Sequence, residues 1–322
     1  MAVLVFGGMG HVGSWIAHDL AAADEDVVIF DLGARGLAGR GLDYLEPHLD
    51  RLTFENVDIL DTHTLFERMR AYEGRIDAVV FGVAVIAGPT FRLRPFRNVQ
   101  INTMGMLNVL EVCRILGVPK FVNLSSGAVY GTAPGGQTET TPTIASDLYG
   151  ATKVANETLA AQYGETFDID VRQARLYFVY GPGKLPSTMH VLYQAIFGPL
   201  QGMRDVAAPA GGGQGLDWTH VRDTSQGVTR LLHAPADVAR GQAFNISSGV
   251  AVPHRDMMAA VTDIMGRDSG MTLGAGAFFE RGAPLDVTKA RTILGFNPRF
   301  DDIRDGLRDY HDWLKSVGKA EE

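Results

Sequence analysis

Val3-Leu4-Val5-Phe6-Gly7-Gly8-Met9-Gly10-His11-Val12-Gly13 opens the chain as an apolar run followed by a glycine-rich turn. The three glycines at 7, 10 and 13 follow a predicted strand, Ala2 to Phe6, and precede a helical pattern. A glycine backbone turns tightly and approaches a phosphate closely, and the N-terminus of the next helix offers free N–H groups. The order of strand, glycine turn and helix therefore predicts a dinucleotide-binding half-domain.

Asp31 ends the second predicted strand, where a carboxylate can accept hydrogen bonds from both ribose hydroxyls of a dinucleotide. Such a carboxylate repels a 2′-phosphate, so we expect NAD rather than NADP. Arg35 is close enough in sequence to meet a phosphate, but we interpret it as a solvated loop residue. The sequence thus predicts NAD as the cofactor.

Short apolar runs alternate with helical patterns through the first half of the chain. The predicted strands are Ala2–Phe6, Val27–Asp31, Leu52–Glu55, Ile76–Phe81, Lys120–Leu124 and Ile169–Leu176. Because parallel strands need crossover connections, which are usually helices, this alternation predicts an α/β fold with a doubly wound parallel sheet. The longest predicted helices are Phe96 to Leu116 and Asp147 to Phe167.

The sequence changes character after the sixth predicted strand, because residues 181–215 are rich in Gly and Pro and poorly periodic. We therefore predict a dinucleotide-binding domain in residues 1–180 and a smaller, mainly substrate-binding subdomain in residues 181–322. Segments near 215–250 are expected to return to the first domain. The glycines at 211–213 and 215 are interpreted as a turn rather than a phosphate cradle, since no clear helix follows them.

Composition narrows the class of partner. The 322 residues carry a formal charge of −8, so nothing indicates binding to nucleic acid or to a membrane surface, and no apolar stretch is long enough to span a bilayer. Cys113 is the only cysteine, which excludes an intrachain disulfide and favours a cytoplasmic location with a buried packing thiol. No His, Asp or Glu spacing is typical of a metal site. We expect a small-molecule substrate.

Tyr149 and Lys153 stand four residues apart in the helix predicted from Asp147, so both side chains share one helix face. A tyrosine ionises near pH 10 and is a poor base at neutral pH unless a nearby positive charge favours the phenolate. The segment 121–131 precedes this helix and delivers the hydroxyls of Ser125 and Ser126 to a loop after a hydrophobic strand.

The glycine turn, the segment Ser125–Gly131 and the segment Tyr149–Lys153 together resemble the extended short-chain dehydrogenase/reductase family, in particular its NAD-dependent epimerase/dehydratase group. The similarity continues through residues 175–183, 217–223, 244–249 and 294–298, and so spans nearly the whole chain. The fold implied is a Rossmann domain with a smaller C-terminal subdomain.

The resemblance assigns roles by position. It implies that Ser126 binds the substrate hydroxyl, that Tyr149 is the acid/base, and that Lys153 binds the ribose and lowers the pKa of the tyrosine. Asn102 resembles the structural asparagine of the catalytic set. The cofactor-binding residues expected are Gly7, Gly10, His11, Val12, Gly13, Asp31, Asp58, Ile59, Phe81, Gly82, Val83, Tyr149 and Lys153.

The resemblance also implies hydride transfer between a substrate carbinol carbon and the nicotinamide, coupled to proton transfer through Tyr149. It further implies a homodimer in which the helices Phe96–Leu116 and Asp147–Phe167 of two subunits form a four-helix bundle.

Several positions depart from the nucleotide-sugar pattern. Gly127 and Ala128 stand where 4,6-dehydratases carry an acidic pair, so we do not expect dehydration. Phe178 stands where many nucleotide-sugar enzymes carry an asparagine near the sugar diphosphate, and Leu216 stands where they often carry an arginine. Two diphosphate contacts that the resemblance implies are therefore missing. The segment Arg281–Asp286 only loosely resembles the Arg-Pro-Gly-Asp segment of these enzymes. These departures favour a smaller, sugar-derived or other alcohol substrate.

Our first prediction is an oxidoreductase, an NAD-dependent dehydrogenase acting reversibly on a secondary hydroxyl or ketone. The alternatives are a sugar or nucleotide-sugar epimerase that retains its NAD and, from another class, a non-catalytic NAD-sensing regulator. The residues expected to line the substrate site are Val85, Ser126, Arg175, Phe178, Thr188, His190 and Trp218.

Overall fold

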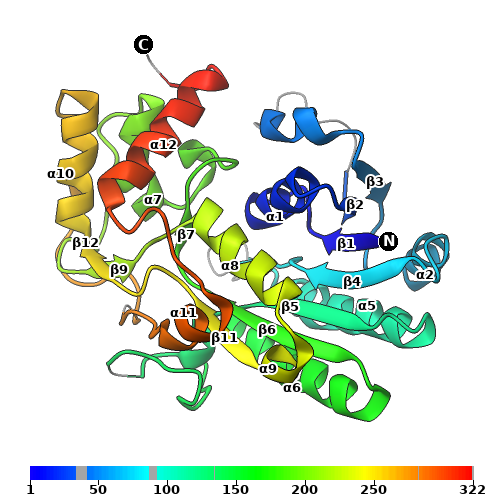
Figure 1. The fold of residues 1–322 in the computed structure, drawn as a ribbon. Coiled ribbons are helices and arrows are strands. Elements are labelled where there is room, and N and C mark those ends of the chain that lie inside the picture. Colours follow the sequence, from blue (N-terminus) through cyan, green and yellow to red (C-terminus); the bar gives the residue numbers. More distant parts are fainter. Residues whose placement is uncertain (34–41, 87–92, 134, 282, 321–322) are drawn as a thin grey trace.

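The computed structural model describes residues 1–33, 42–86, 93–133, 135–281 and 283–320. Arg35 lies outside this part of the chain. The centre of the fold is a seven-stranded sheet with the order β11-β6-β5-β4-β1-β2-β3, in which all pairs are parallel (Figure 1). The strands are β1 Ala2–Phe6, β2 Asp26–Asp31, β3 Leu52–Asn56, β4 Ile76–Phe81, β5 Lys120–Ser126, β6 Asp170–Leu176 and β11 Ala243–Ile246. The predicted doubly wound parallel sheet is confirmed.

Helices cover both faces of the sheet, which explains why its strands are apolar on both sides. One face packs against α1 His11–Ala22, α8 Val221–His233 and α11 Thr288–Leu294. The other face packs against α2 Thr62–Arg70, α5 Gly105–Ile115 and α6 Leu148–Phe167. Cys113 lies in this second layer and is fully buried.

The helix expected over 96–116 is built from three pieces. The short α4, Pro95–Val99, runs into a wider π-helical turn, Gln100–Met104, and then into α5. Inserted residues of this kind often occur at functional sites because they reorient a side chain. Here the turn carries Asn102, whose contacts are described below.

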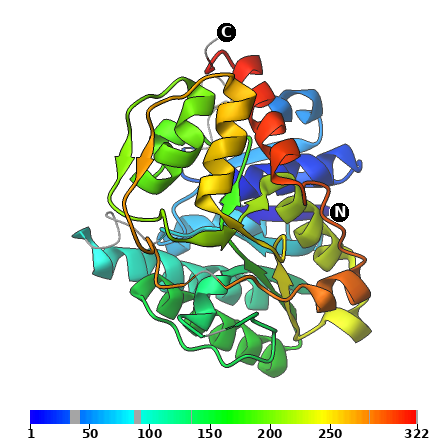
Figure 2. The ribbon, with the colours of Figure 1, turned by 90° about the vertical axis from the view of Figure 1, so that its left-hand side faces the viewer.

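A second apolar core lies beyond β6 and brings together segments that are distant in sequence. Its main helices are α7 Val191–Phe197, α10 His254–Met265 and α12 Ile303–Ser316. Figure 2 shows α10 and α12 side by side, and the two helices are in contact. Short strands edge this region: β7 Val179–Tyr180 with β10 Thr219–His220, β9 Gly215–Asp217 with β12 Ala251–Pro253, and β8 Ala207–Ala208 with β13 Thr272–Leu273.

The remaining short helices connect these layers. They are the 3-10 turns Asp43–His48, Gly127–Tyr130, Pro186–Thr188 and Gly198–Gln201, and the helix α9 Ala236–Ala239. Between Ala236 and β12 the chain passes through β11, so part of the C-terminal half belongs to the main sheet. No helix among the described residues is both long and apolar enough to cross a membrane.

Candidate active site

The glycine turn lies where β1 and β4 end. Gly7 has a φ of +78°, and a Cβ atom on it would lie 3.0 Å from the carbonyl carbon of Gly82. A Cβ atom on Gly13 would lie 2.2 Å from the carbonyl oxygen of Gly7, so α1 packs directly on the turn. Only glycine allows backbone atoms to approach this closely. The backbone N–H groups of the turn stay uncovered by side chains and are suited to binding a pyrophosphate.

The N-terminus of α1 is open toward this turn. Gly10 is its N-cap residue, and no side chain among the described residues caps the helix. The imidazole of His11 lies 3.1 Å from the carbonyl oxygen of Gly181, and burial together with the charge of Lys184 lowers its pKa to about 3. The ring is therefore neutral at pH 7. The positive potential here comes from the free backbone N–H groups, including those near Val12.

Acidic residues follow at the ends of β2 and β3. Asp31 Oδ2 accepts a hydrogen bond of 2.9 Å from the backbone N–H of Met9, which ties this carboxylate to the glycine turn. Asp58 Oδ1 accepts one of 2.9 Å from the N–H of Leu60. Ile59 is buried against Gly105. Together with Phe81, Gly82 and Val83 at the end of β4, these residues fit a dinucleotide with free ribose hydroxyls.

The polar residues at the ends of β5 and α6 form the second half of the site. Asp147 caps α6 by accepting a 2.7 Å hydrogen bond from the N–H of Gly150, which fixes the helical turn that carries Tyr149. Ser126 ends β5, its Oγ accepts a 3.1 Å hydrogen bond from the N–H of Ala128, and its hydroxyl lies close enough to the Tyr149 phenol to lower the pKa of that group. Burial raises the pKa of Tyr149, whereas Ser126 and the charge of Arg281 lower it.

Lys153 lies one helical turn beyond Tyr149. Its side chain is 2 % exposed, and Nζ donates a 2.6 Å hydrogen bond to the carbonyl oxygen of Leu124. Burial lowers the pKa of Lys153 to about 8, and the carboxylate of Glu157 opposes that shift. The ammonium group is thus protonated at neutral pH and can stabilise a phenolate.

Asn102 connects two segments of the site through hydrogen bonds. Its Oδ1 accepts a 2.7 Å hydrogen bond from the N–H of Val85, and its Nδ2 donates to the carbonyl oxygen of Val85 at 3.0 Å and to Thr152 Oγ1 at 3.2 Å. The carbonyl oxygen of Asn102 accepts a 2.8 Å hydrogen bond from Asn156. Asn102 thereby joins the segment after β4 to α6 and acts as a positioning residue.

The structure corrects the expectation for Arg175. Its Nη2 and Nε donate to the carboxylate of Glu157 at 2.7 and 2.9 Å, and its Nη1 donates to the Tyr130 hydroxyl at 2.8 Å. The residue is 5 % exposed. All of its polar side-chain groups are used in this buried network, so Arg175 supports α6 and does not line the substrate site.

Of the other predicted wall residues, Phe178 and His190 belong to a cluster of aromatic side chains that also contains Phe278 and Phe279. Phe178 adopts a φ of +35° and packs against Phe279 with a centroid distance of 5.4 Å. His190 stacks on Phe278 at 5.2 Å, and burial, reinforced by the charge of Lys184, lowers its pKa to about 4. Its ring is neutral at pH 7.

Two predicted wall residues are placed differently. Trp218 is 1 % exposed and packs behind Phe178 and Tyr193, so it supports the wall without forming its surface. Thr188 is exposed, and its Oγ1 donates to the carbonyl oxygen of Leu185 at 2.7 Å within a short turn.

Sequence reasoning missed Gln214 and the segment 278–281 to which it is hydrogen-bonded. Gln214 Oε1 accepts hydrogen bonds from the N–H groups of Phe278 and Phe279, and its Nε2 donates to the carbonyl oxygens of Phe279 and Arg281. This clamp directs Phe279 toward Phe178 and brings Arg281 within 3.1 Å of Asp147. The only sequence signal was the loose similarity of the 281–286 segment.

Gly127 is also explained by packing. A Cβ atom on it would lie 2.5 Å from the ring of Tyr177, and Ala128 is 1 % exposed. The two positions where dehydratases carry acidic side chains are therefore closed by an aromatic ring and by the core.

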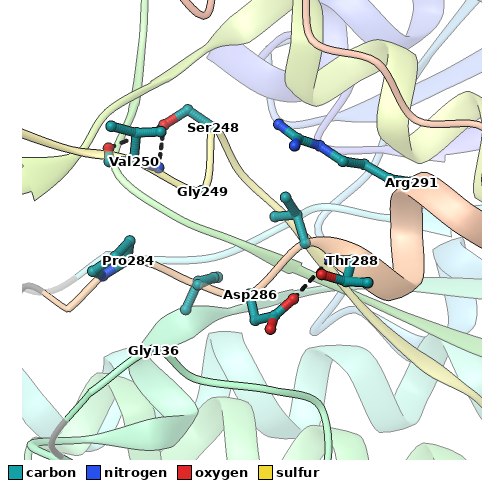
Figure 3. A pocket seen from close by; sticks show the side chains of 10 residues that line it. Gly136, Ser248, Gly249, Val250, Pro284, Asp286, Thr288 and Arg291 are labelled. Carbon is teal, nitrogen blue, oxygen red and sulfur yellow. Dashed lines mark hydrogen bonds between the residues drawn. The ribbon is translucent and has the colours of Figure 1, made fainter.

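A surface hollow of about 330 Å³ is lined mainly by residues of the C-terminal part of the chain (Figure 3). Its walls are the loop Ser248–Val250 and the segment Pro284–Thr288, with Arg291 at one side. Asp217 fixes both walls by accepting hydrogen bonds from Ser248 and from the N–H of Leu285. The hollow shares no residue with the set of Ser126, Tyr149 and Lys153.

Comparison with known proteins agrees with this geometry. The family described as NAD dependent epimerase/dehydratase family matches residues 3–247. A UDP-glucose 4-epimerase of Lacticaseibacillus casei is 26% identical over 97% of this chain and 96% of its own. A dTDP-glucose 4,6-dehydratase of Streptomyces antibioticus is 28% identical over 98% and 92%.

Solved structures give the same result. The UDP-glucuronic acid 4-epimerase from Bacillus cereus, in complex with UDP-glucuronic acid and NAD, superimposes with a TM-score of 0.83 at 25% identity and covers 98% of this chain and 100% of that one. The fold, the glycine turn and the extent of the family match lead to one conclusion. The chain is an enzyme of the NAD-dependent epimerase/dehydratase family, and its cofactor is NAD.

Proposed function

We propose that the protein is an NAD-retaining epimerase that oxidises a secondary hydroxyl of a sugar-type substrate and then reduces the same carbon. The observation that carries the proposal is the arrangement of Ser126, Tyr149 and Lys153 at the ends of β5 and α6. The relatives favour this alternative over the dehydrogenase that was our first prediction, because several of them are sugar-nucleotide epimerases.

Bound NAD supplies the hydride acceptor and donor for this chemistry. Tyr149 accepts the proton of the substrate hydroxyl during oxidation and returns it during reduction. Ser126 donates a hydrogen bond to the same oxygen, and the Lys153 ammonium group stabilises the phenolate form of Tyr149. Asn102 holds the segment at Val85 and the helix α6 in fixed relative positions through its hydrogen bonds to Val85 and Thr152.

Elimination of water is not part of the proposal. It needs an acid and a base beside the substrate, and the Tyr177 ring occupies the space that a side chain at position 127 would need. The same argument distinguishes this chain from its dehydratase relatives.

A dehydrogenase that releases NADH is the second candidate, favoured by the loss of polar groups in the cleft. Phe178 presents an aromatic ring and Leu216 is fully buried, where the resemblance implies an asparagine and an arginine. A small polar substrate suits such a cleft better than a nucleotide diphosphate.

One experiment separates these candidates. The purified enzyme is incubated with NAD and a panel of sugars, sugar acids and UDP-sugars, and products are followed by NMR together with absorbance of NADH. An epimerase yields isomerised substrate without accumulation of free NADH, whereas accumulation of NADH with an equal amount of ketone supports the dehydrogenase. Turnover that is unchanged in Tyr149→Phe excludes both.

We also propose that the C-terminal region from residue 181 supplies most substrate contacts, and that the protein acts in the cytoplasm.

We further propose a homodimer built from α6 and from the helical stretch formed by α4, the π-helical turn and α5. Exposed apolar side chains on these elements support the dimer, among them Phe96 in α4 at 76% and Leu148 in α6 at 55% exposure. Sedimentation is expected to show a dimer at micromolar concentration, and a monomer alone overturns that proposal.

A further inference from the structure

Arg281 presents a hydrogen-bond donor that no group of the described residues uses. Its side chain is 11% exposed, and Nη2 lies 3.1 Å from Asp147 Oδ2. Nη1 is buried and has no hydrogen-bond partner within the described part of the chain. A buried guanidinium N–H without a partner is unfavourable, so the position is suited to a ligand that accepts a hydrogen bond.

The unused donor belongs to a guanidinium that is paired with the N-cap residue of the helix carrying the acid/base. Asp147, which holds the other side of the guanidinium, caps α6 two residues before Tyr149. The charge of Arg281 also lowers the pKa of Tyr149, Tyr177 and Tyr193. The ion pair with Asp147 therefore places Arg281 at the end of α6 that carries Tyr149.

The surroundings of Arg281 limit the charge that can be bound. Asp147 already neutralises one positive charge, and Phe279, two residues before Arg281, packs its aromatic ring on Phe178. Lys184 is a further cation, and it lies close enough to His11, at the glycine turn, and to His190 to lower the pKa of both residues. A carboxylate needs no more than the guanidinium N–H that Arg281 offers, whereas a doubly charged diphosphate needs additional donors.

We propose that the substrate is a polyhydroxy carboxylate and that Arg281 Nη1 binds its carboxylate beside Tyr149. The inference rests on the proposed function and specifies its substrate class. Arg281 is then a specificity-determining residue, and Gln214, which accepts or donates four hydrogen bonds to the 278–281 segment, positions it.

Binding is tested on the NAD-loaded enzyme by titration calorimetry with D-glucuronate, D-gluconate, D-glucose and UDP-glucose. We expect at least one of the two acids to bind and to exceed D-glucose in affinity by about 100-fold, as expected for a charge-assisted contact of about 2.7 kcal/mol. Arg281→Met removes this preference, and Arg281→Lys retains part of it. The exposed Arg255→Met is the matched control and leaves the preference intact.

Guanidinium chloride at low millimolar concentration should restore binding of the acids to Arg281→Ala, which a merely structural role would not predict. The proposal is overturned if neither acid binds, if D-glucose binds equally well, or if Arg281→Met weakens UDP-glucose as much as the acids. Turnover of the acids that survives in Tyr149→Phe contradicts the proposed function while leaving this binding result intact.

Discussion

The ammonium nitrogen of Lys153 lies 5.8 Å from the centre of the Tyr149 ring, one helical turn further along α6. The two side chains differ in the direction in which burial moves their pKa. Burial raises the pKa of Tyr149 and lowers that of Lys153, so each charged form is costly alone. In the proposed mechanism, the positive charge of Lys153 stabilises the phenolate of Tyr149.

This relationship predicts a pH-dependent difference in stability between the enzyme and Lys153→Met. Burial lowers the pKa of Lys153 from 10.5 to about 8, so the folded state binds fewer protons than the unfolded state between these pH values. Stability of the wild type therefore rises with pH in that window relative to the variant, by about 3 kcal/mol in total at 1.4 kcal/mol per unit. Urea unfolding of both proteins across the window measures this, and a constant difference between them contradicts it.

Gly13→Ala should weaken NAD binding by at least about tenfold, which corresponds to 1.4 kcal/mol. The new Cβ atom would lie 2.2 Å from the carbonyl oxygen of Gly7, so the turn must move away from its phosphate-binding shape. Gly136→Ala is the control, because the nearest atom to its Cβ is 3.8 Å away. Calorimetric titration of NAD into both variants checks the prediction, and equal affinities count against it.

Phe178→Asn should improve binding of UDP-glucose by about tenfold, or 1.4 kcal/mol. Asparagine tolerates the φ of +35° better than phenylalanine, and its amide replaces an aromatic surface with a donor and an acceptor. Phe178→Leu enlarges the cleft without adding a polar group and should not show the gain. Competition of UDP-glucose against a bound sugar acid reports the difference, and identical behaviour of the two variants excludes a polar contact at this position.

Much of the fold could be predicted from local patterns in the sequence. The glycine turn, Asp31 and the predicted strands define the sheet, because strand alternation and glycine spacing are local properties. The extra turn at Gln100–Met104 is not visible in the sequence, since it depends on how Asn102 bonds to Val85 and Thr152 across the fold.

The substrate side was harder to predict because it depends on long-range packing. Arg175 is polar and close to the site in sequence, yet Glu157 and Tyr130 occupy its donors. Arg281 lies 134 residues beyond Asp147, with which it pairs, and Gln214 fixes the backbone of the 278–281 segment that carries it. Side-chain pairing of this kind leaves no periodic signal.

The rate of a single turnover in NAD-loaded Tyr149→Phe tests the central claim most directly. It is measured against the wild type with whichever sugar or sugar acid of the panel the wild type converts fastest. Removal of a positioned acid/base should lower the rate by about 10²- to 10⁴-fold while NAD affinity is unchanged. A variant that turns over at the wild-type rate would show that the proton does not pass through Tyr149.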